Sequence, residues 1–212
     1  MTNSKRTTRR IDARSARQIP WKNGLGVTNE IAVWPEASSF ERGDFDWRIS
    51  SATVDSNGPY SSFEDFERIL VVTDGDGLAL DHGSAAPARR VLPLEPYRFA
   101  GAWPTTSELL GRPVHNFNVM FRPDRFTAGV EVLRLDEHEA LRRASLAGHT
   151  LLHVLDGSVN LAPDDPSASL QLHKGDSLWI SQCSATDPLD VEGVETSLLI
   201  LAQITPNSGN PL

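Results

Sequence analysis

The fold class is decided by the stretch LHVLDG at residues 152–157 together with LHKGDSLW at residues 172–179. The same order occurs earlier in the chain, as LVVTDG at residues 70–75 and LPLEPYRF at residues 92–99. In each copy a predicted strand runs into an Asp-Gly turn, and a second strand follows before the next block begins. Chance similarity between two β-hairpins is the alternative. Two matched blocks in the same order favour a duplicated β-unit.

Most of the remaining sequence is typical of short strands, because 14 prolines and 15 glycines interrupt it. Many short strands separated by regular turn signals favour an all-β sandwich or barrel. One helix is predicted, over residues 136–144, with Asp136 as its N-cap and Glu139 as the capping-box partner. The predicted strands cover residues 30–34, 45–54, 67–73, 77–81, 114–122, 129–135, 150–155, 158–161, 169–172, 178–181 and 196–204.

Composition describes an ordinary folded chain. Of the 212 residues, 39% are apolar and 23% are charged, which excludes wholesale disorder. No apolar run approaches the ~18–20 residues that would cross a bilayer, and the N-terminal residues lack the apolar core of a secretory signal. The single cysteine, Cys183, excludes an internal disulfide framework and any C-x-x-C motif. A cytoplasmic location, with no membrane partner, is expected.

Charge speaks against a nucleic-acid partner. The net charge is −8, and residues 1–17 hold six basic side chains and one acid, so that 14 basic and 27 acidic side chains remain in the rest. A body of that charge repels phosphate backbones. The basic N-terminal arm could contact an acidic surface, although a frayed, solvated terminus is the expected state.

Several blocks make the chain resemble a known family. LHKGDSLWI at residues 172–180 is similar to the L-x-x-G-D motif of cupins, and two copies of the β-unit suggest a bicupin. More specific is the joint occurrence of four blocks that resemble the HutD/Ves family, which is named for histidine-utilization operons and for a stress-induced protein. This resemblance spans roughly residues 10–125, whereas the second half resembles cupins only in general. The four blocks are PWKNGLGVTNEI at 20–31, FDWRIS at 45–50, GPYS at 58–61 and FNVM at 117–120.

The resemblance and the repeat together predict an all-β bicupin of two packed β-sandwich or jelly-roll barrels with a short connecting helix. The expected organisation is a disordered basic arm at 1–9, an N-terminal barrel at 10–130, a connector with the helix at 131–147, a C-terminal barrel at 148–206 and a tail at 207–212. N-terminal strands that cross over to complete the second barrel would move these boundaries. A homodimer is possible, because sheet edges must be covered.

The Gly-rich block supplies most of the predicted ligand contacts. Glycines let backbone amides approach a ligand, and a lysine beside an amide can hold a carboxylate. The alternative is a Gly-rich turn with a solvated lysine, and it is the family resemblance that favours the site. Departures from the family pattern at Leu25, Val27 and Asn29 bear on which ligand is chosen. The predicted ligand-binding residues of this block are Trp21, Lys22, Asn23, Gly24, Gly26 and Thr28.

Three predicted strands add further candidates. In 45–54, Arg48 shares a face with small residues, so it could reach into the barrel or pair with Asp46 at the surface. In 114–122, Asn116, Asn118 and Met120 share a face that lines either the interior or solvent. Arg68 follows Glu67, where the family has an acid–arginine pair, and either a structural pair or a ligand contact is consistent with that position.

The sequence offers no metal or cofactor motif. His149 and His153 have the right spacing for a metal only on a helix, since in a strand they would stand ~13 Å apart at ~3.3 Å per residue. No Ser, Cys or carboxylate pair has the context of a nucleophile or acid–base dyad. No catalytic residue, metal or cofactor is therefore predicted.

Three functions follow for comparison. The leading hypothesis is a metal-free cupin that binds a small anionic metabolite and regulates histidine utilization, with N-formylglutamate or urocanate as the ligand that the resemblance implies. The alternative is a cupin enzyme, an isomerase or amide hydrolase acting on a small carboxylate through Lys22 or a convergent histidine. The third is an interaction module whose pocket is plugged by its own side chains.

Overall fold

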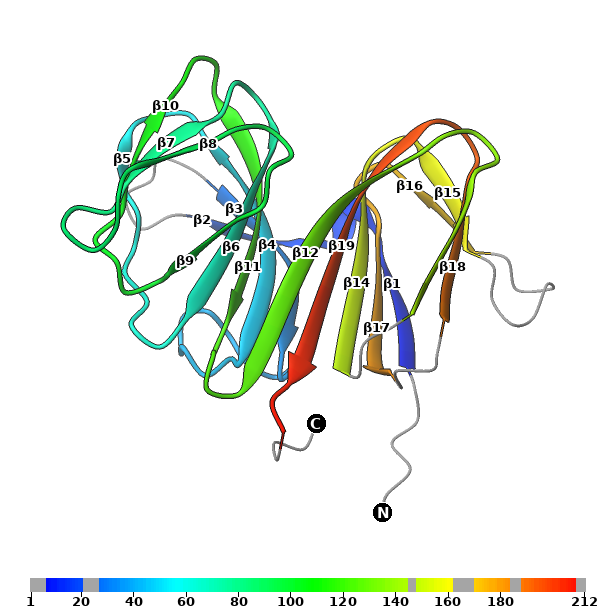
Figure 1. The fold of residues 1–212 in the computed structure, drawn as a ribbon. Helices are drawn as coiled ribbons and strands as arrows, with labels where there is room; N and C mark the ends of the chain where they lie inside the picture. Colours follow the sequence, from blue (N-terminus) through cyan, green and yellow to red (C-terminus); the bar gives the residue numbers. More distant parts are fainter. Residues whose placement is uncertain (1–6, 21–26, 145–147, 162–169, 184–187, 209–212) are drawn as a thin grey trace. The chain divides into compact units, whose positions relative to one another are not determined.

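The computed structural model describes residues 7–20, 27–144, 148–161, 170–183 and 188–208, and these are almost entirely β-strand (Figure 1). The chain divides into two compact units, Ala16–Phe126 and a second unit that combines Met1–Ser15 with Thr127–Leu212. Each unit consists of a larger and a smaller antiparallel sheet. The predicted all-β fold with two sandwich units is confirmed. None of the helices among the described residues is long and apolar enough to cross a membrane.

The N-terminal unit is a sandwich closed by apolar side chains from both sheets. Leu70 and Val72 from one sheet meet Leu78, Leu80 and other side chains from the second sheet in one buried cluster. The six-stranded sheet has the order β2 (Arg17–Pro20), β3 (Val27–Trp34), β4 (Trp47–Val54), β11 (Val114–Phe121), β6 (Glu67–Asp74) and β9 (Tyr97–Ala100). The four-stranded sheet has the order β5 (Gly58–Pro59), β10 (Thr106–Leu109), β7 (Leu78–Asp81) and β8 (Arg89–Val91).

The C-terminal unit has the same construction around its own core. Leu152, Val154, Leu172 and Leu199 belong to a cluster of buried aliphatic side chains from both of its sheets. The five-stranded sheet has the order β1 (Thr7–Ile11), β17 (Ser177–Cys183), β14 (Gly148–Asp156), β19 (Ser197–Pro206) and β12 (Phe126–Leu135). The four-stranded sheet has the order β13 (Ala140–Ala144), β18 (Pro188–Gly193), β15 (Ser158–Leu161) and β16 (Leu170–His173).

Backbone geometry supports the internal repeat. The N–H of Leu94 donates to the carbonyl of Val72 over 2.8 Å, and the N–H of Gly175 donates to the carbonyl of Val154 over the same distance. Both donors have a left-handed backbone, with φ of 68° at Leu94 and 87° at Gly175. Glycine accepts that conformation without steric cost, whereas leucine rarely adopts it. The two units therefore share a connection that their side chains conceal.

The predicted helix over 136–144 is wrong. The N–H of Asp136 does donate to Glu139 Oε2 over 2.9 Å, as in a capping box. However, His138 has a φ of 63°, outside the helical region, and β13 follows at once in antiparallel pairing with β18. Local capping signals cannot compete with a ladder of backbone hydrogen bonds to a neighbouring strand. The predicted connector 131–147 thus includes strands of the C-terminal unit.

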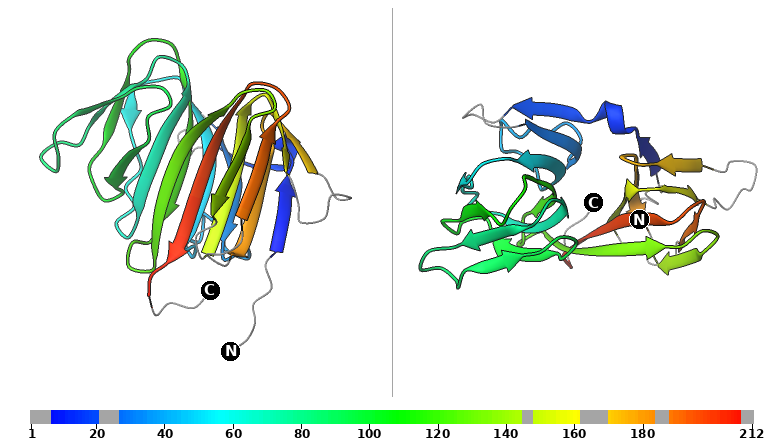
Figure 2. Two further views of the ribbon diagram at one scale, coloured as in Figure 1. Left: turned by 45° about the vertical axis from the view of Figure 1, so that its right-hand side comes forward. Right: turned by 90° about the horizontal axis from the view of Figure 1, so that it is seen from above.

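The N-terminal arm is structured from residue 7 onward, which corrects the prediction of disorder for Thr7–Arg9. Strand β1 pairs antiparallel with β17, from Thr7 opposite Ser181 to Ile11 opposite Ser177. The two strands lie side by side, blue and orange, in both views of Figure 2. The expected crossover of an N-terminal strand into the second barrel is therefore confirmed. The 3-10 turn η1 (Ala13–Ser15) then leads into the N-terminal unit.

Candidate functional site

The asparagine face of β11 lines the interior of the N-terminal unit. Side chains alternate along a strand, so Val114, Asn116, Asn118 and Met120 share one face. Val114 belongs to the buried cluster between the two sheets, and Met120 packs with Phe45 in a second cluster. The two asparagines lie between these clusters and are buried. Of the two orientations that the sequence allowed, the structure has the interior one.

Strand register brings two arginines into the same interior. Arg48 on β4 lies opposite Met120 on β11, and Arg68 on β6 lies opposite the same methionine from the other side. Residues opposite each other on neighbouring strands project to the same face. The two guanidinium groups therefore flank Met120, 20 residues apart in sequence and one strand apart in space. Two isolated arginines of the sequence become one cationic site.

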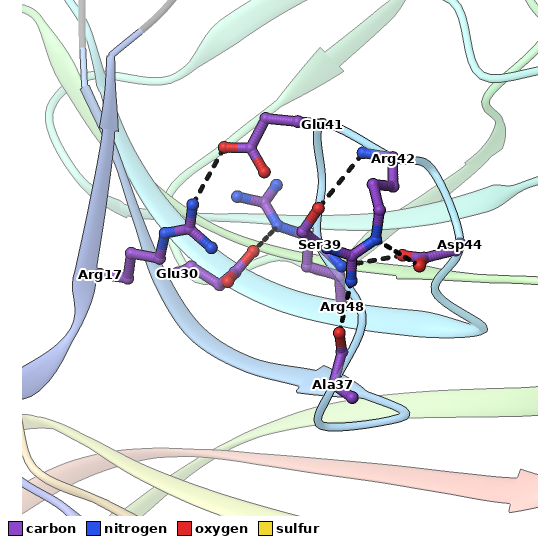
Figure 3. A network of polar contacts seen from close by, with 8 residues as sticks. All are labelled: Arg17, Glu30, Ala37, Ser39, Glu41, Arg42, Asp44 and Arg48. Carbon is purple, nitrogen blue, oxygen red and sulfur yellow. Dashed lines mark hydrogen bonds and ion pairs between the residues drawn. The ribbon is translucent and has the colours of Figure 1, made fainter.

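Arg48 is buried in an ion pair with an acid from the neighbouring strand β3. Its side chain is 4% exposed, and its Nε donates to Glu30 Oε2 over 2.7 Å (Figure 3). Burial lowers the pKa of Arg48, although the bond to Glu30 favours the charged form. Its Nη2 has no hydrogen-bond partner within the described part of the chain. The predicted surface pair with Asp46 is wrong, because Asp46 accepts instead from Arg125 over 2.6 Å.

Arg68 is buried among aromatic rings. Its guanidinium carbon lies 4.9 Å from the ring centre of Tyr60, 5.2 Å from Phe99 and 5.9 Å from Phe63. No described acid forms an ion pair with Arg68, and its buried Nε lacks a hydrogen-bond partner there. Burial lowers the pKa of Arg68 to about 10, so the group stays cationic at neutral pH.

Glu67 and Arg68 do not form the pair that their adjacency suggested. Neighbouring residues of a strand point to opposite faces, and Glu67 binds Arg98 on the face away from the site. Arg68 is left facing the interior without an acid. The structural alternative for this residue pair is therefore wrong.

The interior cluster has an excess positive charge and an unused acceptor. Two guanidinium groups face one carboxylate, that of Glu30, and Asn118 Oδ1 is buried without a donor among the described residues. Buried unpaired charges are costly, and each buried polar atom without a partner calls for an explanation. An anion that also carries an N–H or O–H group would satisfy both atoms. We refer to Glu30, Arg48, Arg68, Asn116 and Asn118 as the interior cluster.

The remaining predicted site residues lie beside this cluster or outside the described residues. Thr28 is half-buried on β3, opposite Ala52. Trp21, Lys22, Asn23, Gly24 and Gly26 lie outside the described residues. No group of three or more His, Cys, Asp or Glu side chains gathers into a metal-binding arrangement in the ranges that the structure describes.

The sequence analysis did not find Glu30 or the aromatic residues around the arginines. Phe40 lies with its ring centre 4.5 Å from the Arg48 guanidinium carbon, and it packs on Phe63 with ring centres 5.7 Å apart. Glu30 could have been found from its alternation with Thr28 on the predicted strand. The contacts of Phe40, Tyr60, Phe63 and Phe99 join loops and strands far apart in sequence, and no local pattern reveals them.

Comparisons with known proteins identify the family. A sequence model of the HutD family matches residues 13–199. An uncharacterized 21.2 kDa protein from the region 3′ of hutC in Pseudomonas putida is 34% identical over 114 residues, which cover 54% of this chain and 58% of the relative. Protein Ves from Cronobacter sakazakii is 38% identical over 114 residues, covering 53% and 59% respectively. The matched segments thus span less than two thirds of the length of these relatives.

Solved structures share the fold over nearly the whole chain. A conserved protein of unknown function from Pseudomonas aeruginosa has a TM-score of 0.83 at 24% identity, covering 95% of this chain and 100% of its own. HutD from Pseudomonas fluorescens, solved in a formate condition, has a TM-score of 0.77 at 25% identity with the same coverage. A bacterial pirin from Escherichia coli has a TM-score of 0.66 at 13% identity, covering 94% and 99%, and shares the cupin-like fold alone.

Proposed function

Because the chain belongs to the HutD family, with its relation to histidine utilization, we propose that its N-terminal unit binds a small anionic metabolite of that pathway and regulates flux through it. The observation that carries the proposal is Arg68, a buried cation without an acid partner in the described part of the chain. A ligand carboxylate supplies that partner through a charge-assisted hydrogen bond.

The composition of the interior cluster indicates which acids suit it. One negative charge on the ligand balances the excess of two guanidinium groups over Glu30. An N–H on the ligand can donate to Asn118 Oδ1, and Met120 offers an apolar wall between the arginines. Urocanate has one carboxylate and an imidazole N–H, whereas N-formylglutamate has two carboxylates and an amide N–H. Lys22 and Asn23 are proposed to hold the second carboxylate where there is one.

Thermal denaturation of EDTA-treated protein with N-formylglutamate, urocanate, histidine or glutamate tests the proposal. A ligand at a hundred times its Kd adds about 2.7 kcal/mol to the free energy of unfolding, which raises Tm by several degrees. We expect one acid to raise Tm in the parent protein and to have no effect on Arg68→Met. Arg90→Met removes an exposed arginine of β8 in the same unit and should respond like the parent.

Two outcomes would contradict binding as the function. If none of the four compounds shifts Tm, or if Arg68→Met responds as strongly as the parent, the interior cluster is not the binding site. If the acid is consumed during the incubation, as followed by chromatography, the enzyme alternative replaces pure binding.

A further inference from the structure

The interior cluster is closed on one side by two phenylalanines from different segments. Phe40 belongs to the loop between β3 and β4 and covers Arg48, whereas Phe63 precedes β6 and lies near Arg68. The two rings pack on each other. Arg48 and Arg68 are only 4% and 8% exposed, so an anion reaches them only if a covering group moves. Either this cover is a permanent plug or it opens.

The loop that carries Phe40 is held together internally. Asp44 Oδ1 accepts from the N–H of Ser39 over 2.8 Å, and Asp44 Oδ2 accepts from Arg42 Nε over 2.7 Å. Ser38 Oγ donates to the carbonyl of Asp44 over 3.1 Å. These contacts, drawn in part in Figure 3, join residues 38–44 to one another rather than to the sheet. The loop can therefore move as one piece.

A single exposed ion pair ties this loop to strand β2. Arg17 Nη2 lies 3.2 Å from Glu41 Oε1, and the two side chains are 57% and 54% exposed. Figure 3 shows this contact spanning from β2 to the loop, directly beside the Arg48–Glu30 pair. Exposed ion pairs are weak and are screened by salt. The tie is thus of the strength expected for a reversible latch.

We propose that residues 38–44 form a lid over the interior cluster, with Phe40 as its inner surface and the Arg17–Glu41 ion pair as its latch. Opening the latch lifts Phe40 from Arg48 and gives a small anion access to both buried arginines. This inference rests on the proposed function, because it describes how the ligand would enter the same site.

Chemical labelling of arginine tests the lid without any ligand. Butane-2,3-dione reacts with accessible guanidinium groups, and peptide mass spectrometry reports the rate at each residue. We expect Arg17→Gln and Glu41→Gln each to label Arg48 and Arg68 about two- to fivefold faster than the parent protein, the range by which an exposed ion pair shifts an equilibrium. The double variant should label no faster than either single variant, since one contact is lost in all three. Raising NaCl should accelerate labelling only where the latch is intact.

Arg112→Gln is the matched control. Arg112 forms an exposed ion pair with Asp76 over 3.3 Å, and it lies before β11, about 20 Å along the strand from the residue opposite Arg48. This variant should label the two buried arginines at the parent rate. Labelling of exposed Arg90 and the urea midpoint should be equal in all variants, which separates lid opening from global unfolding.

Equal labelling of Arg48 and Arg68 in the latch variants, the parent and the control would overturn the lid. Failure of the lid is distinguishable from failure of the proposed function. If an acid raises Tm through Arg68 but labelling is unchanged, only the lid is wrong. If labelling follows the latch but no acid binds, the lid holds and the proposed ligand class is wrong.

Discussion

Arg48 and Arg68 are both buried in the same interior, yet they differ in what their loss leaves behind. Arg48 shares its charge with Glu30 over 2.7 Å, whereas Arg68 has only aromatic rings around it. Removing one partner of a buried ion pair leaves an uncompensated charge. Removing a buried cation that has no partner removes a desolvation cost instead. Stability and binding should therefore separate at these two positions.

We predict opposite effects of methionine at the two arginines on the free energy of unfolding. Arg48→Met should lower it by about 3–5 kcal/mol, because Glu30 remains buried without a partner. Arg68→Met should leave it within about 1 kcal/mol of the parent, because methionine fills the space between the rings. Urea unfolding at neutral pH measures both. The double variant Arg48→Met/Glu30→Leu should recover part of the loss, and equal stability of the two single variants would contradict this account.

At the scale of elements, β14 combines two faces of different character. Leu152 and Val154 enter the core of the C-terminal unit, whereas His149 and His153 alternate onto the other face. Trp179 Nε1 donates to His149 Nδ1 over 3.3 Å, and His153 Nδ1 lies 2.8 Å from Ser177 Oγ. Burial lowers the pKa of both histidines to about 4. These side chains are therefore built into the sheet in their neutral form.

The two histidines predict a loss of stability on mild acidification. Their pKa is about 4 when folded and about 6.5 when unfolded, so the unfolded chain binds more protons between these values, and stability falls as pH falls from 6.5 toward 4. Between pH 7 and pH 5 each histidine should remove about 2 kcal/mol from the free energy of unfolding.

Urea unfolding at pH 7 and pH 5 checks this expectation. His149→Gln and His153→Gln should each reduce the pH dependence by about half of the histidine contribution. His173→Gln, which replaces an exposed histidine on β16, should leave it unchanged. A pH dependence that survives in both buried-site variants would show that other groups cause it.

For the whole molecule, the chain order does not follow the division into units. Strand β1 belongs to the C-terminal unit, although the next hundred residues build the N-terminal one. Asp176 fastens it there: its carboxylate accepts from Arg10 Nη2 over 2.9 Å and from the N–H of Ala13 over 3.0 Å. Burial opposes the ionisation of Asp176, but the N–H groups of His173 and Ala13, with Arg10, lower its pKa below the ordinary value. Cation–π contact of Arg9 with Trp179 adds to this attachment.

Loss of the N-terminal strand should therefore destabilise the far end of the chain. Deleting residues 1–12 exposes the edge of β17, and Asp176→Asn should weaken the same attachment by about 1.5–3 kcal/mol. Hydrogen exchange should accelerate in β17 and β14, while β4 and β11 exchange at the parent rate. Equal acceleration in both units would contradict the division, and no acceleration in β17 would contradict the role of β1.

The sequence by itself determined the all-β class, the duplicated unit, eleven strands and the family, because each depends on alternation, turn residues or local motifs. It also singled out Arg48, Arg68 and the asparagines of β11 as separate candidates. Only the tertiary structure decided that Arg48 and Arg68 flank one methionine, that Glu30 partners one of them, and that Phe40 covers the pair. The same holds for β13, where pairing with β18 outweighed the capping box of a predicted helix. The physical reason is common to both: strand partners come from distant parts of the chain, and the register of their pairing is not encoded in either strand alone.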